Sequence, residues 1–210
     1  MAALSQEARS LTGGICKGIK MNQEQEAKPK IKSYQVLFIA LSLIGVIILY
    51  VIWNIGLLKP VVIEQVRVPE MHLIFKKYQG PYQNVGPVFT EVEKTLVQDK
   101  IACDMTFGRY YDNPNEVEPE RNRADIGCVF TALQDFPTSS ELSAETLTDY
   151  PALVGTFEGA PWLTAFKVYK TLRQEAFQRN IMIDEKAPIL ETYEKTETGF
   201  KTHVYFKLQK

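Results

Sequence analysis

One uncharged segment near the N-terminus constrains this chain more than any other feature of its sequence. Between Ser33 and Leu58 there is no Asp, Glu, Lys or Arg, and the centre of the segment reads VLFIALSLIGVIILYVIW from Val36 to Trp53. An α-helix rises about 1.5 Å per residue, so roughly 20 apolar residues cross the hydrocarbon core of a bilayer. We therefore expect a transmembrane helix over residues 34–58.

Two other structures produce a long apolar segment, a buried core helix and a cleavable signal peptide. A core helix normally carries a polar stripe at helical spacing, and a signal peptide has a shorter apolar run of about 7–15 residues that ends at a small-x-small site. The segment has neither property. Tyr34, Tyr50 and Trp53 lie towards its ends, where amphipathic rings favour the membrane interface. These features favour the spanning helix.

The distribution of positive charge predicts the orientation of this helix. Only Lys59 and Arg67 follow it closely, whereas the residues that precede it include Arg9, Lys17, Lys20, Lys28, Lys30 and Lys32. Because positively charged flanks stay in the cytoplasm, we expect residues 1–33 to form a basic cytoplasmic tail and the domain after the helix to be extracytoplasmic. If the protein starts at Met21, the last three lysines remain and preserve the bias.

Charge and cysteine usage argue against several partners and cofactors. The net charge is −1 with acidic and basic residues interspersed, so there is no basic stripe of the kind that binds a phosphate backbone, and nucleic acid is not an expected partner. Cys16, Cys103 and Cys128 form no CxxC pair, and only His72 and His203 supply imidazole. These residues are too few, and wrongly spaced, for a zinc site. We expect no metal and no cofactor.

Cys103 and Cys128 leave two interpretations open. They form a disulfide if the domain lies in an oxidising compartment outside the cytoplasm. Alternatively, they are free thiols buried in the core, as cysteines often are. We favour the free thiols.

The chain after the apolar helix contains the same pattern twice. Residues 59–70 are an extended linker, rich in β-branched residues and closed by Pro69, and residues 71–210 have the length of one domain. A strand, a helix and two strands are expected at 71–80, 83–100, 105–112 and 124–131, and again at 151–159, 162–180, 188–195 and 201–208. The polar segment 137–145 connects the two units. This pattern predicts an α+β fold of tandem duplicated βαββ units preceded by one transmembrane helix.

Each predicted helix has one apolar face with spacings of three and four residues. The first face consists of Val85, Val88, Phe89, Val92 and Leu96, and the second of Trp162, Ala165, Phe166, Tyr169, Leu172 and Ala176. Gly80 and Gly159 occupy matching places before the helices, where they are expected to turn the strand into the helix. We expect both helices on one side of the sheet, with a groove between the units.

Three stretches of the domain resemble GyrI-like domains, which are also called AraC effector-binding or SOUL-related domains. They are YQGPYQNVGPVFTEVEKTL, GRYYDNPNEVEPERNRADIGCVF and APILETYEK. The resemblance covers nearly all of the chain from Met71 onwards. It implies a small-molecule-binding domain whose cleft, between the two units, takes amphipathic or cationic ligands and contains a carboxylate from a strand of the second unit. Glu191 in LETYE is the matching residue.

The residues themselves place Glu191 in an apolar setting. Alternate side chains of a strand point the same way, so Glu191 shares a face with Ile189 and Tyr193. A carboxylate between aliphatic and aromatic side chains needs a partner. That partner is either an organic cation, held by charge attraction and cation–π contact, or a basic side chain such as Arg109. Both interpretations stay open at this point.

Other candidates for the ligand site lie in the first unit and in the second helix. Phe107, Arg109 and Tyr111 share one strand face, and Gly108 and Tyr110 share the other. Trp162, at the start of the second helix, either roofs the cleft or belongs to the core, which is more usual for a large aromatic at helical spacing. The expected ligand-binding residues are Glu191, Tyr193, Tyr111, Arg109 and Trp162.

Three functions of different classes fit this sequence. The first, which we expect, is a membrane-anchored domain that binds a small amphipathic or cationic ligand, or presents a surface to a protein partner. The second is a hydrolase of strained electrophiles with Glu191 as general base beside Tyr193 or Tyr111. No GxSxG, HExxH or P-loop motif is present, and we do not expect an enzyme. The third is a membrane-anchored scaffold or adaptor that resembles an animal reticulophagy receptor, which also joins a membrane helix to a GyrI-like domain but continues into a long acidic tail.

Overall fold

The computed structural model describes residues 32–103, 105–130, 141–197 and 199–209. Residues 1–31 of the predicted basic tail and residues 137–140 of the connector 137–145 lie outside these ranges. The expected apolar helix is α1, Ser33–Asn54, which is long and apolar enough to cross a membrane. None of its residues is buried in the protein, so the core-helix interpretation is wrong.

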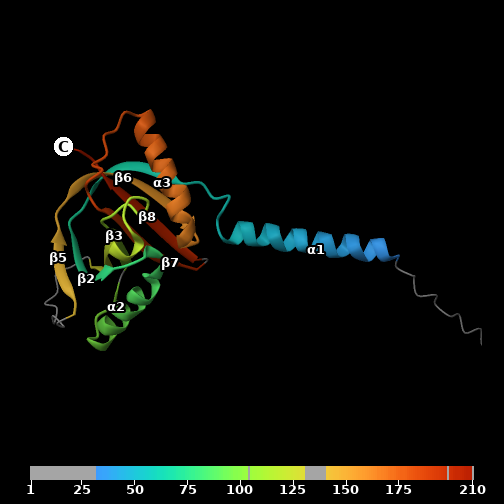
Figure 1. Ribbon diagram of the computed structural model, residues 1–210, viewed down its shortest axis with the longest axis horizontal. Coiled ribbons are helices and arrows are strands. Elements are labelled where there is room, and N and C mark those ends of the chain that lie inside the picture. Colours follow the sequence, from blue (N-terminus) through green and yellow to red (C-terminus); the bar gives the residue numbers. More distant parts are fainter. Residues whose placement is uncertain (1–31, 104, 131–140, 198, 210) are drawn as a thin grey trace, which may run out of the picture. The chain divides into compact units, whose positions relative to one another are not determined.

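One antiparallel sheet of eight strands organises the rest of the described chain. The strands are β1 (Val62–Val68), β2 (Met71–Gln79), β3 (Met105–Tyr110), β4 (Arg123–Phe130), β5 (Ser143–Leu147), β6 (Tyr150–Gly159), β7 (Ile189–Thr196) and β8 (Gly199–Lys207). Their order across the sheet is β1-β6-β8-β7-β3-β4-β2-β5. The sheet is curled (Figure 1). Helices α2 (Gly86–Gln98) and α3 (Pro161–Gln178) connect β2 to β3 and β6 to β7, and short 3₁₀ helices, Tyr82–Asn84 and Pro119–Arg121, precede α2 and β4.

The two predicted βαββ units are present and have the same internal order. In the first unit the strands run β3-β4-β2, with α2 after β2, and in the second they run β7-β8-β6, with α3 after β6. The units join along β3 and β7, where Gly108 lies opposite Glu191. The fold class is therefore α+β with a duplicated unit, as expected.

The two outermost strands of the sheet come from segments to which we assigned other roles. The segment 59–70, assigned to a linker, contains β1, which pairs with β6 of the second unit. The connector runs into β5, which pairs with β2 of the first unit. Each unit thus completes its sheet with the strand that precedes the other unit. β5 is largely exposed and reads SAETL, so it carries no hydrophobic alternation by which to identify a strand.

The sheet separates a layer of side chains inside its curl from a layer beneath the helices. The inner layer includes Val68, Leu73, Phe75, Phe107, Val129, Val154 and Leu190. On the other face, α3 covers Leu153, Phe157, Val204 and Phe206, and α2 covers Ile74, Cys128 and Phe130. Tyr169 of α3 and Phe89 of α2 both contact alternate residues of β7 on that face. Both helices therefore lie on the same side of the sheet, as expected.

The apolar face predicted for α2 is confirmed, whereas the one predicted for α3 is partly wrong. Val92 and Leu96 of α2 are buried, and the other members of its face are partly buried. The buried residues of α3 are Leu163, Thr164, Val168, Leu172 and Ala176. Trp162, Ala165 and Phe166 are exposed, so the buried face is rotated by about one residue, or about 100°. Two apolar stripes overlap on this helix, and only packing on the sheet selects between them.

Cys103 and Cys128 form a disulfide, so the expectation of free thiols is wrong. Their Cα atoms are 5.6 Å apart although the residues are separated by 25 positions in the chain. Pairing of β3 with β4 places Thr106 opposite Cys128. The loop before β3 consequently carries Cys103 to the same point, a contact that depends on strand register and leaves no trace in the sequence.

Candidate ligand-binding site

The carboxylate of Glu191, on β7, is the centre of the candidate site. Both of its oxygens accept hydrogen bonds from phenols: Tyr169 on α3 donates to Oε1, and Tyr193 donates to Oε2 at 2.6 Å. Glu191 itself is only 7% exposed. The predicted shared face of Glu191 and Tyr193 is therefore confirmed, and the helix above the sheet supplies the second donor.

Aromatic rings from the first unit extend these surroundings. The hydroxyl of Tyr110 on β3 lies 3.1 Å from that of Tyr193, and the ring of Tyr110 packs edge-on against Tyr82 with ring centres 4.9 Å apart. Phe89 of α2 packs edge-on against Tyr193 at 5.6 Å. We call Tyr82, Phe89, Tyr110, Tyr169 and Tyr193 the aromatic cage. The cage draws its members from both units because β3 and β7 are neighbours at the join.

Two small residues shape the cage from the sheet side. A Cβ atom on Gly108, opposite Glu191, would come within 2.6 Å of the Tyr110 hydroxyl oxygen. A larger residue there would therefore displace Tyr110. Thr202 lies opposite Tyr193 on β8, and its buried hydroxyl has no hydrogen-bond partner in the described part of the chain. Thr202 is thus an additional polar group beside the cage.

Glu191 is buried without a counterion among the described residues. Among the described residues, no Lys, Arg or His forms an ion pair with it. Burial raises the pKa of Glu191, and the hydrogen bonds from Tyr169 and Tyr193 offset part of that rise. Burial, together with the charge of Glu191, raises the pKa of both tyrosines well above 10.0, so both stay protonated and act as donors. When it is ionised, this carboxylate is a desolvated anion whose hydrogen-bond donors, among the described residues, are two neutral phenols.

Arg109 and Tyr111 do not reach this carboxylate. Both point to the opposite face of the sheet, where Arg109 Nη2 donates to Asp125 at 2.6 Å and to Glu145 at 2.7 Å. Tyr111 donates to Asp125 at 2.6 Å. The ion pair between Arg109 and Glu191 that the sequence left open is absent because the backbone of β3 separates the two faces. In the described ranges, no group of three or more His, Cys, Asp or Glu side chains is arranged to hold a metal ion.

Trp162 is 60% exposed, so the expectation that it belongs to the core is wrong. The aromatic that α3 brings to Glu191 is Tyr169, seven residues further along. Tyr169, Tyr110 and Phe89 were all assigned to the correct faces but were not selected as site residues. A signal existed, because a tyrosine on a buried face needs a partner for its hydroxyl, and Glu191 is a carboxylate on the same layer.

Comparison with known proteins agrees with this fold. The family model of the GyrI-like small molecule binding domain matches residues 62–209. The crystal structure of the EcmrR C-terminal domain has a TM-score of 0.54 at 16% identity, covering 71% of this chain and 98% of that one. EcmrR in its complex with DNA, within EcmrR-RPo, has a TM-score of 0.51 at 14% identity, covering 84% and 70%. SAV2435 bound to tetraphenylphosphonium has a TM-score of 0.48 at 11% identity, covering 70% and 94%.

None of the curated proteins compared with this chain matches it. The solved structures are too distant in sequence to show more than the fold. The family model, in contrast, spans the whole sheet from β1 to β8, including the first strand that the sequence analysis assigned to a linker. The chain therefore belongs to the family of GyrI-like small-molecule-binding domains.

Proposed function

We propose that this protein is a membrane-anchored domain that binds a lipophilic organic cation at Glu191. In this proposal α1 is the anchor and the aromatic cage is the binding site. One observation carries the proposal: Glu191 is buried and accepts hydrogen bonds from two phenols, but no basic side chain of the described residues neutralises it. A cationic ligand would supply the missing charge.

The chemistry of the cage favours a cation with apolar substituents. Charge attraction is stronger in a desolvated site than in water, and each aromatic face adds about 0.5–2 kcal/mol of cation–π attraction. The carboxylate oxygens have further lone pairs beyond the two that the phenols use. Tyr169 and Tyr193 are only partly buried, and one of these rings has to swing aside to admit a ligand. A hydrophilic cation would gain less, because it would lose its hydration without gaining apolar contacts.

Two observations support an extracytoplasmic position of the domain. Six basic residues precede the apolar helix, whereas only Lys59 and Arg67 follow it closely, which favours a cytoplasmic N-terminus. The disulfide between Cys103 and Cys128 is a bond that persists in oxidising compartments and is rare in the cytosol.

Binding is proposed rather than catalysis because the groups nearest to Glu191 are protonated phenols that donate to it. A general base would instead need to accept a proton from a bound water or substrate. An adaptor role would have been favoured by an exposed or ion-paired Glu191, and the geometry of the site supports neither.

The test is equilibrium binding by the full chain in lipid nanodiscs. The probe is tetraphenylphosphonium, a lipophilic cation, and its control is tetraphenylborate, which has the same shape and the opposite charge. We expect Glu191→Gln to weaken tetraphenylphosphonium binding at least tenfold, because removing one partner of a desolvated charge pair costs about 2–5 kcal/mol and about 1.4 kcal/mol is one decade.

A matched variant separates the site from the general charge of the domain. Glu194→Gln removes an exposed carboxylate from the same strand, and we expect it to leave binding unchanged. The difference between wild type and Glu191→Gln nanodiscs cancels partition of the probe into lipid. If wild type and Glu191→Gln bind tetraphenylphosphonium equally, Glu191 is not part of the site. The same conclusion follows if wild type binds the cation and the anion more tightly than Glu191→Gln by the same factor.

A further inference from the structure

The outward face of α3 carries exposed aromatic residues that the ligand site does not use. Trp162, Phe166 and Phe177 are 60%, 74% and 85% exposed. On a helix they fall within an arc of about 60°, opposite the face that packs on the sheet. A row of aromatic rings left in water along one helix is unfavourable by the hydrophobic effect. We call this surface, together with the two basic residues described next, the α3 outer face.

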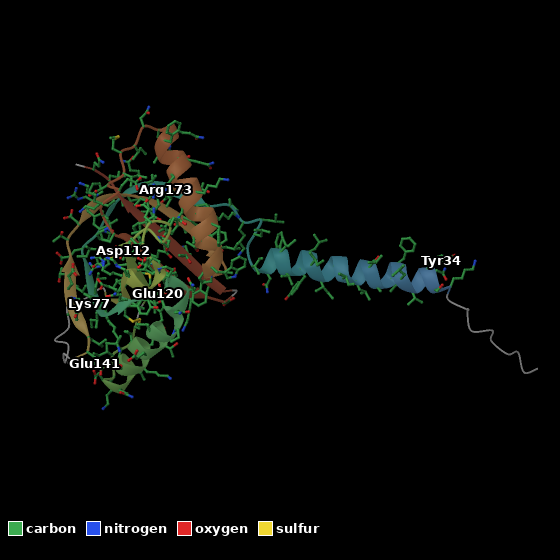
Figure 2. All side chains as sticks on the ribbon, in the orientation of Figure 1. Tyr34, Lys77, Asp112, Glu120, Glu141 and Arg173 are labelled. Atoms are coloured by element: carbon green, nitrogen blue, oxygen red, sulfur yellow. A yellow bond between two sulfur atoms is a disulfide. The ribbon has the colours of Figure 1, made fainter. Side chains whose placement is uncertain are left out.

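Basic side chains lie between the aromatic rings of this face. Lys170 follows Phe166 by one turn and forms no ion pair among the described residues. Arg173, which Figure 2 labels on α3, lies one turn further along the helix. It is half exposed and pairs with Glu185 at 2.7 Å. Exposed aromatics interleaved with Lys and Arg are the pattern of helices that lie in a membrane interface, where the rings enter the headgroup layer and the cations meet phosphates.

The chain that leaves α1 is fastened to the beginning of this same helix. The backbone N–H of Ala160, just before α3, donates to the carbonyl of Ile55 at 3.0 Å. Lys167 of α3 donates from Nζ to the carbonyl of Leu57 at 2.7 Å and also to that of Lys59. α1 ends at Asn54, so the three residues whose carbonyls accept these bonds, Ile55, Leu57 and Lys59, lie within five positions of the end of the apolar helix.

The contact is too close to allow a side chain at its centre. Gly56 has a φ of +79°, and a Cβ atom there would come within 2.6 Å of the Glu158 carbonyl oxygen. A Cβ on Gly159 would come within 2.6 Å of the Ile55 carbonyl oxygen. Gly56 and Gly159 thus let the backbones pack directly. The segment that follows α1 is therefore packed directly on the start of α3.

We infer that the α3 outer face lies on the surface of the bilayer that α1 spans. The inference rests on the membrane anchoring proposed above. Residues 55–59 follow α1 directly and pack on the start of α3. Trp162 and Phe166 therefore lie near the point at which the chain leaves the bilayer. The remaining rings and Lys170 continue the same face along the helix. The occupant of this surface is therefore lipid, with the rings among the headgroups and the lysine at the phosphates.

The chain contains its own reporter for a test, because it has only two tryptophans, Trp53 and Trp162. The Trp53→Phe variant of the full chain, placed in nanodiscs, leaves Trp162 as the sole emitter. We expect acyl chains brominated near the headgroup to quench most of its emission, and aqueous iodide to quench little. Emission that resists brominated lipid but responds to iodide would overturn the inference.

Two further variants keep the test independent of anchoring and of folding. Trp162→Phe leaves Trp53 as the emitter, and its quenching by brominated lipid reports that α1 is in the bilayer. Quenching of Trp53 without quenching of Trp162 would refute the docking of α3 and leave the proposed function intact, whereas loss of both would refute the anchor. Val97→Trp, made in a chain without the other tryptophans, reports from an exposed position of α2 and should stay accessible to iodide.

A last variant addresses the contact that holds α3 at the membrane. Gly56→Val forces residues 55–59 away from Glu158, and we expect Trp162 in that variant to lose its protection from iodide while the emission of Trp53 stays quenched by lipid. Unchanged protection of Trp162 would show that this contact is not what holds the face in place, and would count against the inference.

Discussion

Replacing Glu191 by glutamine removes a charge while keeping the shape of the side chain, and the structure sets the expected effect on stability. The carboxylate has no counterion among the described residues and accepts hydrogen bonds from Tyr169 and Tyr193. We expect the free energy of unfolding of Glu191→Gln at pH 7 to equal or exceed that of the wild type. A residue held in a structural salt bridge would behave in the opposite way.

The magnitude follows from two opposing contributions. A hydrogen bond to a charged group is worth about 1.5–3 kcal/mol and a neutral one about 0.5–1.5, so two weakened bonds cost about 2–3 kcal/mol in the variant. Burial of an ionised carboxylate costs several kcal/mol, and the variant is relieved of that cost. Breaking a buried salt bridge would instead destabilise by about 3–5 kcal/mol. For a chain of this size about 1 kcal/mol shifts Tm by roughly 2–4 °C, so the two interpretations are well separated.

The dependence of this difference on pH gives an independent check. Burial raises the pKa of Glu191 above its ordinary value of 4.5, so the folded protein binds this proton more tightly than the unfolded chain. Stability of the wild type relative to Glu191→Gln is therefore highest below pH 4.5 and decreases as the pH rises through the folded pKa. Other carboxylates cancel in the comparison.

Thermal denaturation of both proteins from about pH 4 to 8 measures the difference. A difference in Tm that does not change with pH, or a large loss of Tm in the variant at pH 7, would refute the assignment of Glu191 as a buried charge without a partner.

Other predictions concern the disulfide, the second charge cluster and the orientation. Replacing Cys103 and Cys128 together by serine should lower the free energy of unfolding by about 3.5 kcal/mol, from the entropy of opening a loop of 25 residues, as measured by urea denaturation; no change would mean that the bond is not formed. Arg109→Met should destabilise by about 3–5 kcal/mol in the same assay, because Asp125 is left buried without its cation; a loss below about 1 kcal/mol would indicate a solvated pair. A cysteine placed at the exposed Glu197, in a chain with no other free thiol, should react with a membrane-impermeant reagent on intact cells, and reaction only after lysis would reverse the predicted orientation.

Much of the local structure was readable from the sequence because its causes are local. The apolar helix follows from the uncharged run after Lys32, and the two βαββ units follow from helical and alternating spacings that repeat. The shared face of Glu191 and Tyr193 follows from the geometry of any strand. The family resemblance, carried by residues 78–96, 108–130 and 187–195, correctly selected the GyrI-like fold.

The partners of each side chain were decided only by the tertiary structure. Whether Glu191 meets a cation or a phenol depends on which residues of β3 share its face of the sheet and on the rotation of α3 about its own axis. Two overlapping apolar stripes on α3 made that rotation ambiguous in the sequence. Pairing of β5 with β2, and the contact of Cys103 with Cys128, join residues through strand register. Hydrophobic spacing fixes which face of an element is buried, but it carries no information on which neighbour buries it, because that choice is made by the packing of the whole sheet.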